Sequence, residues 1–273
     1  MSLSAPGVPT GRRVVAVRFA MLVVTGVLLT LGVLWSAQLW LIVYSHGSGV
    51  GVDLHQYQEH ARRWLDTGQL YLPRQLAGPT SVMDGDPLYP PTILYLLVPF
   101  LWLPELVWWL VPLAVLAYAL IRFRPRMWTW PLLAAVLAWP RTPALIFYGN
   151  PGMWMDAAIA AGLLWAWPSA LVLLKPSLGP FALLGIRHRS WWVAVGVVIL
   201  LSIPFGGLWL DYLSVLRNSG VSITYSVLDL PLAIAPIIAW LGRRDPSVGI
   251  APPWAGLASL RTRLASRLVS RPT

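Results

Sequence analysis

The sequence predicts an all-α fold, a polytopic transmembrane helical bundle of about seven to nine hydrophobic segments. Apolar residues make up 57% of the 273 residues and charged residues 11%, and the mean hydropathy is +0.66. A soluble domain of this length would be less apolar. The 17 Trp and 25 Pro support the same class, because Trp gathers at membrane interfaces and neighbouring helices tolerate proline breaks.

The net charge of +10 comes from arginines that stand in short clusters between apolar segments. Membrane proteins concentrate Arg and Lys in cytoplasmic loops, so this pattern favours loops on one side of a bilayer over a nucleic-acid surface. The chain has no cysteine, which excludes disulfides and thiolate metal sites. The clusters are Arg12, Arg13 and Arg18; Arg122, Arg124 and Arg126; Arg187 and Arg189; Arg243 and Arg244; and Arg261, Arg263, Arg267 and Arg271.

Residues 1–18 predict a cytoplasmic N-terminal segment, and the apolar run Phe19–Tyr44 that follows is long enough to cross a bilayer. This run is too long for a cleaved signal peptide and has no convincing cleavage site. We therefore expect a single transmembrane domain over residues 19–241, with a large extracytoplasmic first loop at 45–91. A basic, loosely ordered cytoplasmic tail is expected at 242–273.

The predicted first loop is rich in acidic residues and histidines. Its stretch Gly51–Pro91 contains five of the ten acidic residues and two of the four histidines. Apolar side chains at three- and four-residue spacings predict an amphipathic helix over Asp53–Leu65, lying on the membrane surface. Gly68 and the stretch Gly78–Pro91 favour irregular loop.

Two of the later apolar segments leave alternatives open. If Thr92–Leu103 and Leu106–Ile121 each cross, the arginines at 122–126 lie outside; if they form one broken passage, these arginines lie inside.

The segment Ala170–Ile186 is interrupted at Lys175, which favours a re-entrant piece between Pro168 and Ile186. The other segments are Met127–Trp139, Met153–Trp167, Trp191–Phe205 and Ser226–Leu241, with polar breaks at Pro140–Gly152 and in an outer loop that carries Asp211, Tyr212, Arg217 and Asn218.

Asp53 lies just beyond the first span, at the boundary between water and lipid. Partial desolvation raises the basicity of a carboxylate, which suits it to deprotonating a hydroxyl group. The alternative is a structural role, because Asp is a good helix N-cap.

His55 and His60, together with Glu59, offer side chains that can bind metals. Their spacing does not stack the two imidazoles on one helix face, so we expect no metal site. Arg62 and Arg63 could hold a phosphate through charge-assisted hydrogen bonds, or pair with neighbouring carboxylates.

Asp84, Asp86 and Tyr89 precede a Pro-Pro entry into the next segment, where the DGDP sequence also favours a simple turn. Lys175 stands among apolar residues, and an ionisable group there is a functional candidate, with snorkelling to the interface as the alternative. The same reasoning applies to Asp156, with a helix start as its alternative.

Four stretches carry a family resemblance through their order and spacing. They are VDLHQYQEHARRWLDTGQLY at 52–71, DPLYPPTILYLLVPFLWLP at 86–104, FYGNPGMW at 147–154 and LLKPSLGPFALLGIRHRSWW at 173–192. Together they resemble the membrane-integral glycosyltransferases of the C superfamily, and within them glycosyltransferase family 87, the polyprenyl-phosphate-mannose-dependent mannosyltransferases. The resemblance covers residues 14–241. Gly149-Asn150-Pro151 stands where the family usually has Gly-Gln-x-Asn, and members usually have further spans.

The resemblance implies a GT-C-like fold and an inverting transferase of the bacterial cytoplasmic membrane. It would move a hexose, with mannose as the first choice, from polyprenyl phosphate to a lipid or glycan acceptor on the outer face. Asp53 would be the catalytic base, and Lys175, with Arg62 or Arg63, would bind the donor phosphate. No cofactor, metal or nucleic acid is implied. The remaining substrate-binding residues would be His55, Tyr57, Asp86, Tyr89 and Asn150.

The alternative is a non-catalytic or transporter-like membrane protein that binds lipid-linked sugars. A transporter is expected to place paired charges at the bilayer midplane on broken helices, whereas the acidic residues here concentrate in one loop. Convergence of Asp53, Asn150 and Lys175 on one cavity would favour the enzyme.

Overall fold

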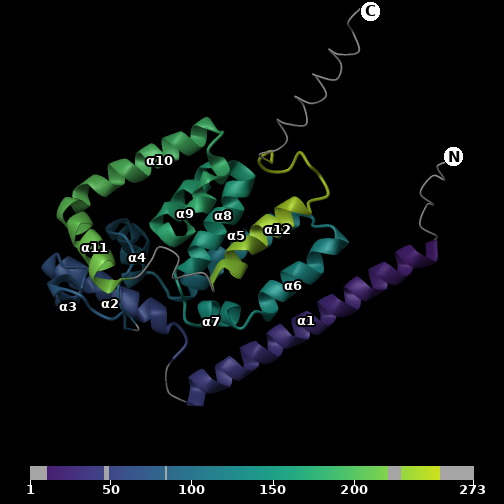
Figure 1. The fold of residues 1–273 in the computed structure, drawn as a ribbon, viewed down its shortest axis with the longest axis horizontal. Coiled ribbons are helices and arrows are strands. Elements are labelled where there is room, and N and C mark those ends of the chain that lie inside the picture. Colours follow the sequence, from purple (N-terminus) through teal and green to yellow (C-terminus); the bar gives the residue numbers. More distant parts are fainter. Residues whose placement is uncertain (1–10, 46–48, 84, 221–228, 253–273) are drawn as a thin grey trace, which may run out of the picture.

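The computed structural model describes residues 11–45, 49–83, 85–220 and 229–252, and every named element in these ranges is a helix (Figure 1). The predicted all-α class is confirmed for this part of the chain. The N-terminal residues up to position 10, Asp84, the first residues of the predicted segment Ser226–Leu241 and the arginines from Arg261 onward lie outside the described residues.

Three described helices are long and apolar enough to cross a membrane, and a fourth is added if the pair α6 and α7, bent by 65°, counts as one span. This agrees with the predicted membrane protein. The three candidate spans are Arg13–Ser45, within α1 (Gly11–Ser45); Leu106–Phe123, which is α5; and Arg189–Ser219, which joins α10 (Arg189–Ser202), η7 (Ile203–Phe205) and α11 (Gly206–Ser219).

The remaining helices are shorter. They are α2 (Val52–Thr67), α3 (Pro73–Ala77), η1 (Pro91–Ile93), α4 (Leu94–Leu97), η2 (Val98–Leu101), η3 (Met127–Thr129), α6 (Trp130–Ala138), α7 (Arg141–Phe147), α8 (Gly152–Trp165), η4 (Trp167–Leu174), η5 (Pro176–Leu178), α9 (Gly179–Ala182), η6 (Leu183–Gly185) and α12 (Leu230–Leu241). In Figure 1, α1 lies along one edge and α10 with α11 along the opposite edge, with α5, α8 and α12 between them.

The helical bundle has two ends, which we call the Asp53 end and the Arg126 end. At the Asp53 end, the chain after α1 meets the end of α7, where the amide of Gly51 donates to the carbonyl of Phe147 at 2.8 Å. At the Arg126 end, the chain after α5 meets the end of α12, where the amide of Arg126 donates to the carbonyl of Gly242 at 2.8 Å. The α1 and α5 helices therefore each join one end to the other.

Helix α5 joins the two ends without the segment 91–101, which bears on the first of the open alternatives. The segment 91–101 starts after Tyr89 at the Asp53 end and stays there, since the carbonyl of Phe100 accepts a 2.8 Å hydrogen bond from Gln58 of α2. The start of α5 is at the same end, because Glu105 lies 2.9 Å from His55. The arginines at 122–126 thus lie at the end opposite Asp53.

Residues 167–185 form a hairpin with its tip at Lys175. Its two arms meet at the Arg126 end, where the hydroxyl of Ser169 donates to the carbonyls of Ala166 and Ala182. The tip reaches Asp229 at the other end. Gly162 makes the packing on α8 possible, because a Cβ there would lie 2.6 Å from the Cβ of Ser169. This geometry fits the predicted re-entrant piece.

One predicted polar break is wrong, and another is helical in part. Asp211, Tyr212, Arg217 and Asn218 lie on α11 and not in a loop, with Tyr212 buried at 6% exposure. Their polar spacing belongs to an amphipathic helix that continues α10. The predicted break Pro140–Gly152 contains α7, whose Thr142 hydroxyl donates to the carbonyl of Val136 at the bend.

Two further predictions need correction. The apolar face of α2 contacts protein, because Leu54 and Ala61 are fully buried against the segment 91–101 and its neighbours. The start of the predicted loosely ordered tail also packs on the bundle. The indole of Trp240 donates to the carbonyl of Ile250, and the amide of Ile250 donates to the carbonyl of Leu163.

Candidate active site

A polar cavity of about 430 Å³ lies at the Asp53 end. It is lined by α2, the segment 82–89, the turn between α7 and α8, the hairpin tip and the start of α12. A larger pocket of about 650 Å³ lies at the Arg126 end but contains no carboxylate. The smaller cavity is therefore the candidate active site. Its charged and hydrogen-bonding side chains include Asp53, Tyr57, Asp86, Tyr89, Arg141, Asn150, Lys175 and Asp229.

The backbone at the start of α2 leaves the Asp53 side chain available. Gly51 is the N-cap and has a φ of 87°, a left-handed conformation that favours glycine. The amide of Asp53 donates to the carbonyl of Tyr148 at 2.9 Å, and no side chain caps the helix. The N-cap alternative for Asp53 is therefore wrong, and its carboxylate faces the cavity.

Asn150 holds the Asp53 carboxylate in place. Oδ1 of Asn150 accepts the amide of Gly152 at 2.8 Å, which directs its Nδ2 to donate to Oδ2 of Asp53 at 2.7 Å. Tyr89 adds a longer bond of 3.4 Å from its hydroxyl to Oδ1 of Asn150. The backbone amide of Gly152 thus fixes the orientation of the Asn150 side chain that donates to Asp53.

Burial is the main influence on Asp53 and raises the pKa of its carboxyl above the usual value. The Asn150 hydrogen bond and the positive charges of Arg141 and Lys175 act in the opposite direction, since each favours the ionised form. A carboxylate of raised basicity that is still stabilised when ionised can accept a proton from a bound hydroxyl group.

Two cations face this carboxylate across the cavity, both paired with Asp229. Nζ of Lys175 lies 3.4 Å from Oδ2 of Asp229, and Nε of Arg141 lies 3.3 Å from its Oδ1. Lys175 is only 3% exposed and lies 5.7 Å from the centre of the Tyr89 ring. Lys175 therefore points into the site, and the snorkelling alternative does not hold in this structure.

Arg141 and Asp229 were missed by the sequence analysis. Arg141 begins α7 inside the predicted polar break, and Asp229 precedes the last apolar helix. The signal that singled out Lys175, an ionisable residue within an apolar segment, applies to Asp229, which lies inside the predicted segment Ser226–Leu241.

The structure brings together six of the nine predicted site residues: Asp53, Tyr57, Asp86, Tyr89, Asn150 and Lys175. The other three do not line the cavity. His55 pairs with Glu105 on an exposed face, Arg62 is exposed, and Arg63 donates to the backbone carbonyls of Gln69 and Leu70. Asp86 lines the cavity, but its carboxylate is bound to Arg74 and to the amide of Met83.

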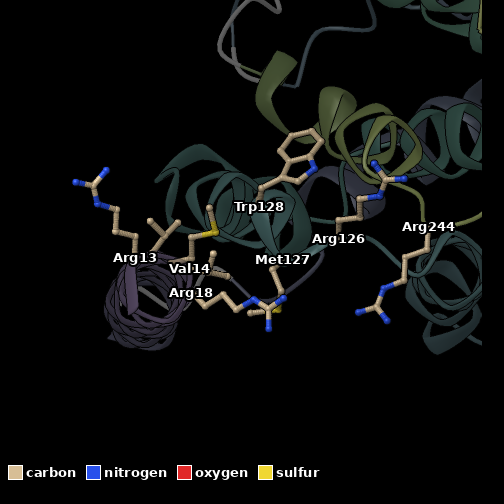
Figure 2. Close-up of a pocket in the computed structure, with 9 residues that line it drawn as sticks. Arg13, Val14, Arg18, Arg126, Met127, Trp128 and Arg244 are labelled. Carbon is tan, nitrogen blue, oxygen red and sulfur yellow. The ribbon is translucent and has the colours of Figure 1, made fainter. Parts of the chain in front are cut away.

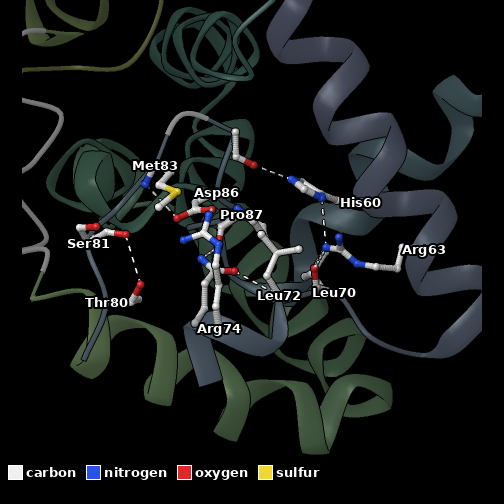
Figure 3. Close-up of polar contacts among 12 residues, drawn as sticks. His60, Arg63, Leu70, Leu72, Arg74, Thr80, Ser81, Met83, Asp86 and Pro87 are labelled. Carbon is white, nitrogen blue, oxygen red and sulfur yellow. Dashed lines mark hydrogen bonds and ion pairs between the residues drawn. The ribbon is translucent and has the colours of Figure 1, made fainter. Parts of the chain in front are cut away.

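Figure 3 shows how polar contacts tie the segment 83–87 to α2 and α3. Nε2 of His60 donates to the carbonyl of Gly85 at 2.6 Å, because a carbonyl can only accept. Nη2 of Arg63 donates to Nδ1 of His60 at 3.0 Å, so this nitrogen has a free lone pair and the ring is neutral. Burial lowers the pKa of His60, which agrees with a neutral ring.

The described residues contain no group of three or more His, Asp or Glu side chains that could hold a metal ion. His55 and His60 instead take separate partners, Glu105 and Gly85. Of the carboxylates that line the cavity, Asp53 is held by Asn150, whereas Asp86 and Asp229 are paired with cations.

Comparison of the chain with protein-family models, curated proteins and solved structures found no match. The resemblance of the four sequence stretches to family 87 stays a prediction.

Acidification is expected to destabilise the fold through His60. The unfolded chain binds a proton on this ring at higher pH than the folded protein, so stability is lost as the pH falls below about 6.5. Thermal unfolding of the purified protein at pH 7.5 and 5.5 should show a larger fall in Tm for the wild type than for His60→Gln. The control His55→Gln, at an exposed position, should behave as the wild type; an equal fall in all three proteins would contradict the assignment.

Proposed function

We propose that this chain is a membrane glycosyltransferase that moves a hexose, with mannose as the first candidate, from a polyprenyl-phosphate-linked sugar to a lipid or glycan acceptor. The chain would form a GT-C-like bundle of about seven to nine hydrophobic segments, with the Asp53 end on the outer face of a bacterial cytoplasmic membrane. One observation carries the proposal: a partly buried carboxylate, held by Asn150, faces Lys175 and Arg141 across a single cavity.

Asp53 is the general base in this proposal. The acceptor hydroxyl oxygen forms a bond to the anomeric carbon of the donor sugar, and the bond from that carbon to the phosphate oxygen breaks. The electron pair of the broken bond stays with the phosphate, and Asp53 takes the hydroxyl proton. The raised pKa of Asp53 supports this role, because it makes the carboxylate a stronger base than an exposed one.

Lys175 and Arg141 are the proposed ligands of the donor phosphate. Both pair with Asp229, which compensates the buried charge of Lys175. An entering phosphate would share these cations, and they would stabilise the charge that grows on the departing phosphate. Arg141 takes the place predicted for Arg62 or Arg63, which do not line the cavity.

Tyr57 and Tyr89 supply a surface for the sugar ring. Their rings meet edge to face with centroids 5.2 Å apart, and both line the cavity beside Asn150. Aromatic rings offer apolar area with a polar tip, which matches the mixed surface of a hexose. We therefore place the sugar between Asp53 and these rings.

A transporter-like or non-catalytic protein that binds lipid-linked sugars is the second candidate, and the Lys175–Asp229 pair favours it. The two residues stand at the tip of a hairpin and at the start of α12. Paired charges on interrupted helices are typical of transporters. In that case the cavity would bind the sugar lipid without transferring the sugar.

Replacement of the base tests the proposal. The change Asp53→Asn keeps the shape of the side chain but removes its ability to take a proton, so transfer should fall by about 10²–10⁴-fold. The assay follows radiolabelled mannose from polyprenyl phosphomannose into endogenous lipid, in membranes that contain equal amounts of each protein. Asp66→Asn, an exposed change on the same helix, is the control.

Transfer by the Asp53 variant at the rate of the wild type would remove Asp53 as the base. Binding of the donor lipid without transfer by the wild type, across a panel of lipid-linked hexoses, would instead support the second candidate.

The acid limb of the pH–rate profile should report the pKa of Asp53. Asn150→Ala removes a hydrogen bond that lowers this pKa. The pKa therefore rises, and the acid limb of kcat/KM in the variant should move to higher pH. The pH–rate profiles of the two proteins, measured in the same detergent, provide the comparison. A lower kcat/KM with an unmoved acid limb would contradict the contact between Asn150 and the titrating base.

A further inference from the structure

Four arginines from three separate parts of the chain line one pocket at the Arg126 end. Arg13 and Arg18 come from α1, Arg126 from the chain between α5 and η3, and Arg244 from the chain after α12. The pocket has a volume of about 650 Å³. In Figure 2, Arg18 and Arg244 extend toward one another, whereas Arg13 points away from the other three arginines. We call this cavity the arginine pocket.

The backbone fixes two sides of the arginine pocket against each other. The amide of Arg126 donates to the carbonyl of Gly242, and the amide of Arg244 donates to the carbonyl of Phe123 at 3.2 Å. Helix α1 forms the third side and packs on α6 and η3. The cationic cluster is thus a product of the fold and not of one basic run in the sequence.

No carboxylate of the described residues pairs with any of these four guanidinium groups. Asp245, which follows Arg244, accepts two hydrogen bonds from Ser247 instead. The sequence at 1–10 and at 253–273 contains no Asp or Glu, so these parts have no acidic side chain to offer. Neutralisation of the four arginines therefore requires an anion other than an acidic side chain of these parts of the chain.

The rest of the lining is apolar: Val14, Val17, Met21, Met127 and Trp128. Val17 is 53% and Trp128 42% exposed, so this surface is open to an apolar ligand. Arg13 is also the first residue of a candidate membrane span, which places the pocket at the boundary of the apolar layer. A ligand that fits has an anionic group and an apolar chain next to each other.

We propose that the arginine pocket binds an anionic phospholipid. Its phosphodiester accepts charge-assisted hydrogen bonds from the arginines, and its acyl chain lies over the apolar residues of α1 and η3. Basic pockets between transmembrane helices bind such headgroups in general. The proposal is independent of the transferase proposal, because it concerns the other end of the bundle.

The test compares two lipids that share acyl chains and differ in headgroup charge. The purified full chain in detergent is titrated with dioleoyl phosphatidylglycerol or dioleoyl phosphatidylcholine, and native mass spectrometry counts the bound lipid. We expect phosphatidylglycerol to bind about tenfold more tightly or better. The double variant Arg126→Gln/Arg244→Gln should lose this preference, and so should Arg18→Gln in part. The matched control Arg122→Gln/Arg189→Gln has the same net charge and changes exposed arginines outside the pocket.

Three outcomes would overturn the proposal. The first is equal binding of the two lipids by the wild type. The second is a preference for phosphatidylglycerol that survives in Arg126→Gln/Arg244→Gln at the level of the control. The third is displacement of the lipid by an equal concentration of inorganic phosphate, which would show a site for soluble anions. Arg18→Gln alters an exposed position on α1, so its effect on binding can be read even if the double variant folds poorly.

Discussion

Asn150 donates a hydrogen bond to Asp53 across 97 residues of sequence, and this contact joins α2 to the turn between α7 and α8. The turn is itself held from several sides. The amide of Asn150 donates to the carbonyl of Leu145, and the fully buried Trp108 donates from its indole to the carbonyl of Gly149 at 2.8 Å. These contacts fix the position of the Asp53 carboxylate, so the shape and the chemistry of the cavity depend on them.

The charged groups of the cavity stand where helices begin or break. Asn150 lies in a turn, Lys175 lies between η4 and η5, and Asp229 precedes α12. Each break frees backbone carbonyls, which need donors inside an apolar bundle. Side chains supply such donors at the turn around Asn150, where Trp108 donates to the carbonyl of Gly149 and Trp109 to that of Ile146. The many tryptophans of the sequence thus act as hydrogen-bond donors within the bundle as well as at its surface.

Local patterns predicted much of the fold. The helix expected at Asp53–Leu65 is present as α2 within two residues at each end, and the first span is present as α1. The prediction was wrong where polar residues lie on a helix: the residues around Asp211 were interpreted as a loop, yet they lie on α11, where Tyr212 is buried and Arg217 is exposed. Polarity alone does not separate a surface helix from a loop.

The candidate site was predictable only in part, because it is built from long-range contacts. Asp53 was identified as a charged residue just beyond an apolar segment and Lys175 as one within an apolar segment, and the structure brings both to one cavity. The pairing of Lys175 with Asp229, across 54 residues, leaves no local trace in the sequence. The contacts of Arg63 are local instead. Its carbonyl partners Gln69 and Leu70 lie just beyond α2, and their positions depend on the turn at Gly68.

The most direct measurement of the central claim is protection of the cavity by the donor lipid. The chain has no cysteine, so a thiol placed at Met83, which lines the cavity and is 55% exposed, reports on that site alone. The account predicts that polyprenyl phosphomannose slows alkylation of Met83→Cys and leaves Leu65→Cys, on the exposed side of α2, unaffected. Equal alkylation rates with and without the donor lipid, at concentrations that saturate binding to the protein, would contradict the claim that this cavity is the donor site.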